Sequence, residues 1–137
     1  MRVKLLDGAI SPTRSHKDDA GLDLYARFDA VIYPGEGECF DTGVCIELSP
    51  GTFGKIESRS GLNAKHGIVS CGVVIDQGYT GSIVVKLYNL SDRRYYIKAG
   101  DRIAQLIIQP YVYVDLEVVD ELTDTDRGKA GIGSTGR

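Results

Sequence analysis

Alternating apolar and polar positions recur along the chain, and clusters of turn-forming residues separate them. In "VCIELS", Val44, Ile46 and Leu48 fall on one face of an extended segment. The same alternation runs through "VYVDLEV" (112–118). "SIVVKLYN" (82–89) is apolar on both faces except at Lys86, as in a strand in the middle of a sandwich or barrel. The pattern predicts a strand at each of these segments.

Turn-forming clusters such as "YPGEGE", "LSPGTFG" and "KAGDR" interrupt the strands about every ten residues. This spacing predicts an all-β fold, either a sandwich, a barrel or a jelly roll. Only "SGLNAKHG" (60–67) could form a short helix, with Ser60 as its N-cap. We expect a single domain over 1–137, with a β core over 1–120 and a polar, glycine-rich C-terminal arm over 121–137.

Composition narrows the class of protein. The net charge is −3 without a basic block, which argues against binding to nucleic acid, although a single nucleotide remains a candidate ligand. No apolar run approaches the ~18 residues of a membrane span, and the first residues do not resemble a signal peptide. We therefore expect a cytoplasmic protein, or an intracellular one in an infected host cell if the source is viral, without membrane contact.

The three cysteines and two histidines do not form a metal-ligand pattern. Cys39, Cys45 and Cys71 lack CxxC spacing, which predicts reduced and mostly buried thiols. His16 and His66 have no partner spacing of the kind found in zinc sites. Any metal must therefore be held by other groups.

Two stretches could bind phosphate. The tail "RGKAGIGSTG" (127–136) contains G-x-G-x-x-G, but a dinucleotide fingerprint must open a helix, and this chain stops at residue 137. Glycine N–H groups with Arg127, Ser134 and Thr135 could still enclose a phosphate, or the segment could be a tail without a ligand. In "ESRSGLNAKHG", Arg59, Ser60 and Gly61 offer an anion cradle, or else a capped helix beside a surface arginine.

Three further polar residues stand out. In "GVVIDQGYTGS", Asp76 follows an apolar strand and precedes a tight hairpin turn with Tyr79, where a carboxylate could act as a general base or make an Asx turn. Asp23 in "DAGLDLYA" and Gln105 in "AGDRIAQLII" interrupt apolar strands. Each needs a partner, which could be a ligand or the backbone.

Taken together, these stretches resemble the dUTP diphosphatase (dUTPase) family. They follow the order A-G-x-D-L, R-S-G-L, G-V-[V/I]-I-D-x-x-Y-x-G, G-D-R-I-A-Q-L and R-G-x-x-G-x-G-S-T-G, from residue 19 to residue 136. The resemblance implies a distorted jelly-roll or barrel-like sandwich that forms a homotrimer, whose C-terminal strap closes a site on neighbouring subunits. It also implies hydrolysis of dUTP at the α-phosphorus to dUMP and pyrophosphate, which keeps uracil out of DNA and supplies dUMP for dTMP synthesis.

The resemblance also implies roles for residues around the nucleoside. Asp76 matches the general base that activates water, and Tyr79 matches the residue that packs under the deoxyribose. The hairpin formed by residues 72–79, including Gly72 and Val73, would contact uracil through its backbone. Ile132 stands where the family usually has a phenylalanine that stacks on the base, a loss of about 1 kcal/mol.

For the triphosphate, the resemblance implies contacts from Arg59, Ser60, Gly61 and Gln105. A Mg²⁺ ion would be chelated mainly by the phosphates and reached by Asp23 through water. The γ-phosphate would be clamped by Arg127, Ser134 and Thr135.

The chain departs from the family pattern at several positions besides Ile132. Gly78 and Thr80 replace an aspartate and an arginine, and Val73 stands where glycine is usual, which alters the hairpin that would contact uracil.

Two alternatives use the same fold. A dCTP deaminase would need a glutamate where this chain has Lys86, which disfavours deamination. A nucleotide-dependent regulatory module that binds another protein stays open as an alternative or an added role, although Asp76, Tyr79 and every phosphate motif are retained, which indicates an intact catalytic site. A purely structural jelly roll would have no reason to keep all of them.

Overall fold

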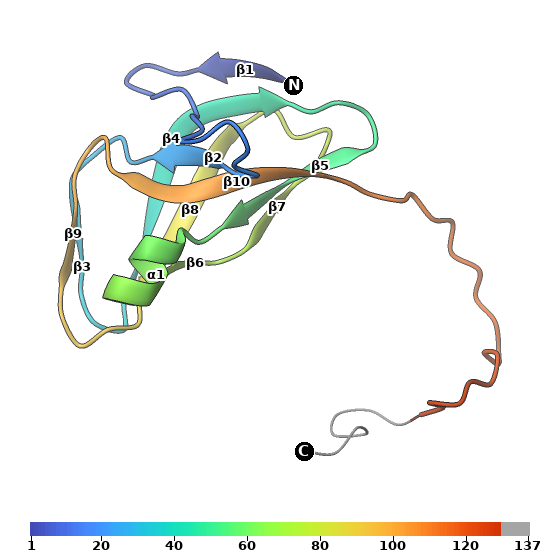
Figure 1. The fold of residues 1–137 in the computed structure, drawn as a ribbon. Coiled ribbons are helices and arrows are strands. Elements are labelled where there is room, and N and C mark those ends of the chain that lie inside the picture. The colour runs from blue at the N-terminus through green and yellow to red at the C-terminus, as the bar shows by residue number, and fades with distance from the viewer. Residues whose placement is uncertain (130–137) are drawn as a thin grey trace.

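The strands assemble into two four-stranded antiparallel sheets and one two-stranded sheet (Figure 1). The computed structural model describes residues 1–129, so the expectations for Ile132, Ser134 and Thr135 lie outside the described residues. The first sheet has the order β1 (Arg2–Leu5), β4 (Gly37–Glu47), β8 (Ser82–Asn89) and β6 (Ile68–Ser70). The second has the order β2 (Leu22–Tyr25), β10 (Arg102–Pro110), β5 (Thr52–Glu57) and β7 (Val73–Ile75). β3 (Ala30–Ile32) pairs with β9 (Tyr95–Ile97).

One apolar cluster joins all three sheets. On β8, Ile83, Val85 and Leu87 are buried, whereas Lys86 lies on the opposite face, as a period of two requires. The cluster also takes Leu24 from β2 and Leu106 from β10. The all-β prediction is therefore confirmed, and the sheets do not close into a barrel.

The single short helix α1 (Ser60–His66) lies where the sequence predicts it. Its N-cap is Arg59 rather than Ser60, and Arg59 makes no side-chain capping bond, so the expected cap is wrong by one residue. The helix ends at Gly67, whose φ of 65° is left-handed and whose N–H donates to the Asn63 carbonyl. Among residues 1–129, no helix is long and apolar enough to cross a membrane.

The strand predicted over 112–118 is wrong for the isolated chain. After β10 the segment extends away from the sheets (Figure 1), and its apolar side chains are exposed, with Leu116 at 91% and Val118 at 97%. A strand requires a partner for its backbone N–H and C=O groups. The structure assigns no strand to residues 112–118 of this chain.

The predicted 72–79 hairpin and the predicted burial of the thiols also need correction. β7 pairs with β5, whereas β8 pairs with β4 and β6, so the turn after β7 crosses between two sheets instead of closing a two-stranded hairpin. Cys45 is buried, but Cys39, on the outer face of β4, and Cys71, directly after β6, are exposed. All three are free thiols, as expected.

Candidate functional site

A cavity of about 370 Å³ opens between the segment before β2, the start of α1 and the side chain of Gln105 on β10. It brings together five residues that the sequence singles out: Asp23, Arg59, Ser60, Gly61 and Gln105. These residues come from segments more than 30 positions apart in the chain. The strand pairing explains their meeting, because Gln105 lies opposite both Asp23 on β2 and Glu57 on β5.

Asp23 is the central charge of this cavity. Its side chain is only 12% exposed, and both carboxylate oxygens accept hydrogen bonds from guanidinium groups. Arg59 donates from Nε to Oδ1 at 2.9 Å, and Arg102 donates from Nη1 to Oδ2 at 3.1 Å. The Ser15 hydroxyl donates to Oδ2 at 3.4 Å. The polar residue inside an apolar strand is thus satisfied by side chains rather than by backbone.

Gln105 is held against the backbone of the neighbouring strand. Its Nε2 donates to the Ser58 carbonyl at 3.0 Å, directly before Arg59. A Cβ at Gly21 would collide with the Gln105 side-chain oxygen. Glycine at this position therefore allows the Gln105 amide to lie over β2.

Asp76 and Tyr79 lie in the turn between β7 and β8. The Tyr79 N–H donates to the Asp76 carbonyl, and the Tyr79 hydroxyl donates to the Ser82 carbonyl, both at 2.9 Å. A Cβ at Gly81 would lie 2.6 Å from the Tyr79 hydroxyl oxygen, so Gly81 makes room for the ring. Gln77 accepts a hydrogen bond from the Gly51 N–H at 2.9 Å and ties the turn to the loop before β5.

Neither Asp76 nor Tyr79 lines the cavity around Asp23, and neither do Gly72 and Val73. β2 and β7 are the two edges of one sheet, about 14 Å apart at about 4.8 Å per strand. Arg127 lies on the extended C-terminal segment. A single chain therefore does not bring the proposed base and the proposed phosphate-binding residues into one site.

The side chains of this cavity suit a magnesium ion only if substrate phosphates supply most of its ligands. Among residues 1–129, no group of three or more histidine, cysteine, aspartate or glutamate side chains could hold a metal. Asp19 and Asp23 are the carboxylates that line the cavity. Mg²⁺ keeps several waters and commonly binds through one or two carboxylates plus substrate phosphates, which these residues can accommodate.

Sequence reasoning missed several residues at this cavity. Ser15, His16 and Asp19 line it from the segment before β2, and Arg102 reaches Asp23 from β10. The polar run "SHKDD" directly ahead of "AGLDL" could have marked the first group. Arg102 is the first residue of β10 and lies in the G-D-R-I-A-Q-L stretch, which could have marked it, although the pattern there singles out only Gln105.

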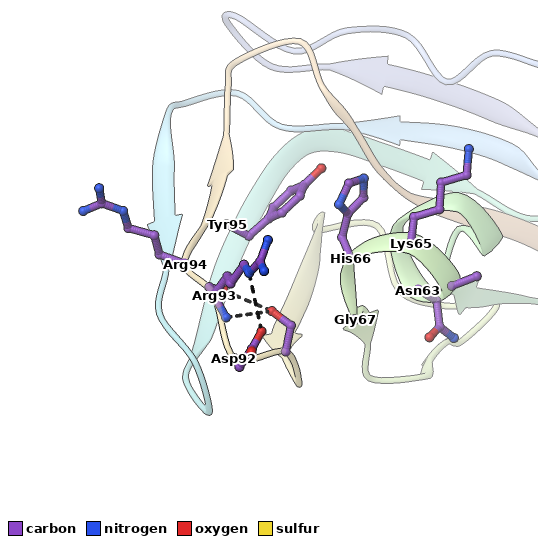
Figure 2. Close-up of a pocket in the computed structure, with 10 residues that line it drawn as sticks. Asn63, Lys65, His66, Gly67, Asp92, Arg93, Arg94 and Tyr95 are labelled. Atoms are coloured by element: carbon purple, nitrogen blue, oxygen red, sulfur yellow. Dashed lines mark hydrogen bonds and ion pairs between the residues drawn. The ribbon is translucent and has the colours of Figure 1, made fainter.

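A second cavity, of about 480 Å³, lies between the C-terminal end of α1 and the loop after β8 (Figure 2). Its basic side chains are partly engaged: Arg93 lies 3.9 Å from Asp92, and Arg94 turns away to lie over the Tyr96 ring. The His66 and Tyr95 rings are 5.0 Å apart and hold the helix against β9. No residue predicted for the site lines this cavity.

Lys86, which the sequence left unexplained, belongs to the outer face of the first sheet. Its Nζ lies 5.1 Å from the centre of the Tyr88 ring, and hydrogen bonding to Tyr88 raises the pKa of the Lys86 ammonium. Cys39 lies opposite it on β4, and the Cys71 N–H donates to the Lys86 carbonyl at 3.1 Å. Lys86 is thus accounted for by neighbours in its own sheet.

Known proteins resemble this chain over most of its length. The dUTPase family matches residues 7–136. The deoxyuridine 5'-triphosphate nucleotidohydrolase of Corynebacterium glutamicum is 50% identical over 129 residues, covering 92% of this chain and 87% of the relative. The enzyme of the same name from Clostridioides difficile is 42% identical over 135 residues, covering 97% and 94%.

Solved structures resemble the chain equally well. The dUTPase of Staphylococcus bacteriophage 80alpha, solved with dUPNHPP, matches with a TM-score of 0.92 and 31% identity, covering 99% of this chain and 98% of that one. A mutant dUTPase of the Staphylococcus aureus phage phi11, described with a structural Mg(II) ion, matches with a TM-score of 0.81 and 30% identity, covering 88% and 96%. The motifs, the cavity around Asp23 and these similarities agree, and the chain belongs to the dUTPase family.

Proposed function

We propose that this protein hydrolyses dUTP at the α-phosphorus to dUMP and pyrophosphate in the cytoplasm. The observation that carries the proposal is the cavity that collects Asp23, Arg59, Ser60, Gly61 and Gln105 in a member of the dUTPase family. Relatives are named deoxyuridine 5'-triphosphate nucleotidohydrolases. The cavity combines a guanidinium, a hydroxyl and an amide, which are donors suited to phosphate oxygens.

In this proposal the phosphates occupy the cavity. The Arg59 guanidinium, held on one edge by Asp23, offers its remaining N–H groups to phosphate oxygens. Ser60 contributes its hydroxyl, and Gln105 contributes its amide near the α-phosphate. Mg²⁺ carried by the phosphates would neutralise part of their charge, with Asp23 contacting its water shell. The C-terminal Arg127, Ser134 and Thr135 would clamp the γ-phosphate.

Asp76 is the proposed base, and Tyr79 would pack beneath the deoxyribose. Asp76 is exposed at the end of β7, so a water molecule can reach its carboxylate. The ring of Tyr79 is fixed by its hydrogen bond to the Ser82 carbonyl, which favours a rigid surface for the sugar. Gly72, Val73 and Ile132 would contact uracil.

We infer a homotrimer in which neighbouring chains share each site. In one chain, β7 and β2 lie at opposite edges of a sheet, which supports a site in which a second chain supplies Asp76 to the cavity around Asp23. The exposed apolar residues of 112–122 support association, because a chain rarely leaves such a segment in water. A trimer would cover this segment and complete the site.

The decisive experiment follows pyrophosphate release from dUTP with Mg²⁺, with dCTP, dTTP and UTP in parallel. Release from dUTP alone is expected, and Asp76→Asn should lower turnover by about 10² to 10⁴ while dUTP still binds. Unchanged turnover in Asp76→Asn would remove Asp76 as the base. Binding of dUTP without hydrolysis by the native chain would instead favour a regulatory module.

A further inference from the structure

A β-bulge in strand β10 places one more cation, Arg102, in contact with Asp23. Gln105 lies opposite Asp23, and Ala104 opposite Leu24, but the register then shifts so that Arg102 lies opposite Tyr25. Residues opposite one another in an antiparallel pair share a face, and alternate residues of a strand share it too. The bulge therefore brings Arg102 to the face of Asp23 and Gln105.

Burial along β10 agrees with this placement. Ile103 and Ala104 are consecutive, yet both are buried in the core, at 1% and 0% exposure. Regular alternation would have turned one of them outward. Without the extra residue, Ile103 would oppose Tyr25 and Arg102 would fall on the buried face. Re-aiming a side chain in this way is a common use of bulges beside functional sites.

Arg102 is oriented by the same carboxylate that orients Arg59. Its Nη1 donates to the Ser15 hydroxyl at 2.6 Å and to Asp23 Oδ2 at 3.1 Å. The Nη1 of Arg59 donates to the Arg102 carbonyl at 3.3 Å, which links the two arginines directly. Arg102 itself lines a neighbouring cavity of about 290 Å³, which shares Arg59 with the cavity around Asp23. Asp101, the acidic residue of this neighbouring cavity, accepts a hydrogen bond from the Lys98 N–H.

Two guanidinium groups share the carboxylate of Asp23, so these three side chains together carry a net positive charge. The other carboxylate that lines the cavity, Asp19, accepts a hydrogen bond from the His16 N–H. The Arg102 side chain is 44% exposed and that of Arg59 is 31% exposed, so solvent and ligands can reach both. A guanidinium fixed along one edge loses less conformational entropy when its other N–H groups bind an anion.

We propose that Arg102 is a second phosphate-binding cation of the site and that Asp23 is the positioning residue that fixes Arg102 and Arg59 together. The proposal rests on the proposed function and adds a residue to it. Because Asp23 acts here through the arginines, its contribution to phosphate binding is present with or without a metal ion. Removing the Asp23 charge leaves two guanidinium groups close together without their common counter-ion, and they separate.

The test measures binding of inorganic tripolyphosphate to the full chain by calorimetry, in EDTA and then with Mg²⁺. Arg102→Gln and Asp23→Asn should each weaken binding in EDTA by about ten- to a hundredfold, as expected for a charge-assisted hydrogen bond. The double variant should bind no more weakly than about the worse single one, because the two residues act as a unit. Arg94→Gln, the same charge change on an arginine outside the cavity, should stay within about twofold of the native chain.

Further variants separate positioning from folding. Ser15→Ala keeps every charge but removes one Arg102 contact, and should weaken binding by about two- to tenfold. Thermal unfolding of each variant checks its stability, and in dUTP hydrolysis Arg102→Gln should raise KM more than it lowers kcat. Arg102→Gln binding within twofold of the native chain, or Asp23→Asn weakening binding only when Mg²⁺ is present, would overturn the proposal. A native chain that binds tripolyphosphate but does not turn over dUTP would overturn the proposed function alone, since the binding comparison still decides the role of Arg102.

Discussion

At the scale of single residues, the closest approach at the cavity is the one between Gly21 and Gln105. A Cβ at position 21 would lie 3.0 Å from the Gln105 Cβ and would collide with its amide oxygen. The Gln105 side chain has to move if position 21 carries any side chain. The hydrogen bond from Gln105 to the Ser58 carbonyl would then be broken.

We predict that Gly21→Ala lowers kcat/KM for dUTP and destabilises the fold by about 1 kcal/mol, the net value of one hydrogen bond. Steady-state kinetics and denaturant unfolding measure the two effects. Gly78→Ala is a matched control for stability, because no atom lies within 4 Å of its added Cβ and the fold should tolerate it. Native kinetics in Gly21→Ala would mean that the position of the Gln105 amide does not matter for turnover.

At the scale of elements, β4 contains an irregularity between Asp41 and Cys45 where it pairs with β8. Gly43 has a φ of 68° there, a left-handed conformation that favours glycine. Asp41 accepts hydrogen bonds from the Ser82 hydroxyl and from the Gly43 N–H. Hydrogen bonding to Ser82, and then to Gly43, lowers the pKa of Asp41. The ionised carboxylate therefore stabilises the bulge.

Because the pKa of Asp41 is lowered in the folded state, the direction in which stability changes with pH is determined. The contribution of Asp41 to stability is fully present above the unfolded pKa of about 3.9 and is lost as the pH falls through the lower, folded pKa. We predict that Asp41→Asn flattens the acid limb of a plot of unfolding free energy against pH below about 4. Asp92→Asn, the same charge change at an exposed position, controls for net charge. If unfolding free energy fell equally steeply below about pH 4 in the native and Asp41→Asn proteins, ionised Asp41 would not be stabilising the fold.

Several elements could be located from the sequence, because period two reports burial on one face. This holds for β8, where core residues alternate with outer ones. It holds only in part for β4, where the predicted core residues Val44 and Ile46 are buried but so is Cys45 between them. The same pattern gave a wrong strand prediction for 112–118 of the isolated chain. Alternation indicates that one face of a segment is buried, but not whether the same chain or a neighbouring one buries it. The bulge in β10 and the pairing of β7 with β5 depend on register, which period two leaves open.

The same limit applies to the site. The local pattern singled out Asp23, Arg59 and Gln105, since each is a polar residue in an unusual place. Arg102 belongs to the same G-D-R-I-A-Q-L stretch as Gln105, but an arginine at the start of a strand is ordinary, and only the register shift turns it toward Asp23. The distance between β7 and β2 could not be inferred without the order of strands in the sheet.

At the scale of the whole molecule, the C-terminal segment separates from the sheets after Tyr111. Tyr111 itself still contacts the sheets: its N–H donates to the Gly51 carbonyl, and the centre of its ring lies 6.4 Å from the centre of the Phe53 ring. Beyond this point Val112, Leu116 and Val118 are exposed, whereas residues 123–129 are mostly polar. Assembly and closure of the site should therefore depend on different parts of the segment.

We predict that truncation after Thr125 abolishes dUTP hydrolysis but leaves the proposed trimer intact, whereas truncation after Tyr111 disrupts the proposed trimer as well. Sedimentation velocity and pyrophosphate release measure the two properties. The apolar residues of 112–122 remain in the first variant and are lost in the second. Full activity after truncation at Thr125 would exclude the tail from the site.

Sharing of sites between chains predicts complementation. When Asp76→Asn protein is unfolded, mixed with the Thr125 truncation and refolded, some sites should receive Asp76 from one chain and the tail from another. The refolded mixture of these two inactive variants should then hydrolyse dUTP measurably, at a fraction of the native rate. A mixture as inactive as its parents, with mixed trimers present by mass spectrometry, would place Asp76 and the tail of each site on the same chain.

Because the three thiols differ in exposure, their rates of chemical modification can report local opening of the first sheet. Cys39 and Cys71 are exposed, whereas Cys45 is buried opposite Lys4 of the edge strand β1. In the isolated chain an alkylating reagent should modify two cysteines quickly, and the third only when β1 detaches or the chain unfolds. The rate at which Cys45 is modified therefore reports how often the β1 edge of the first sheet opens, without an engineered label.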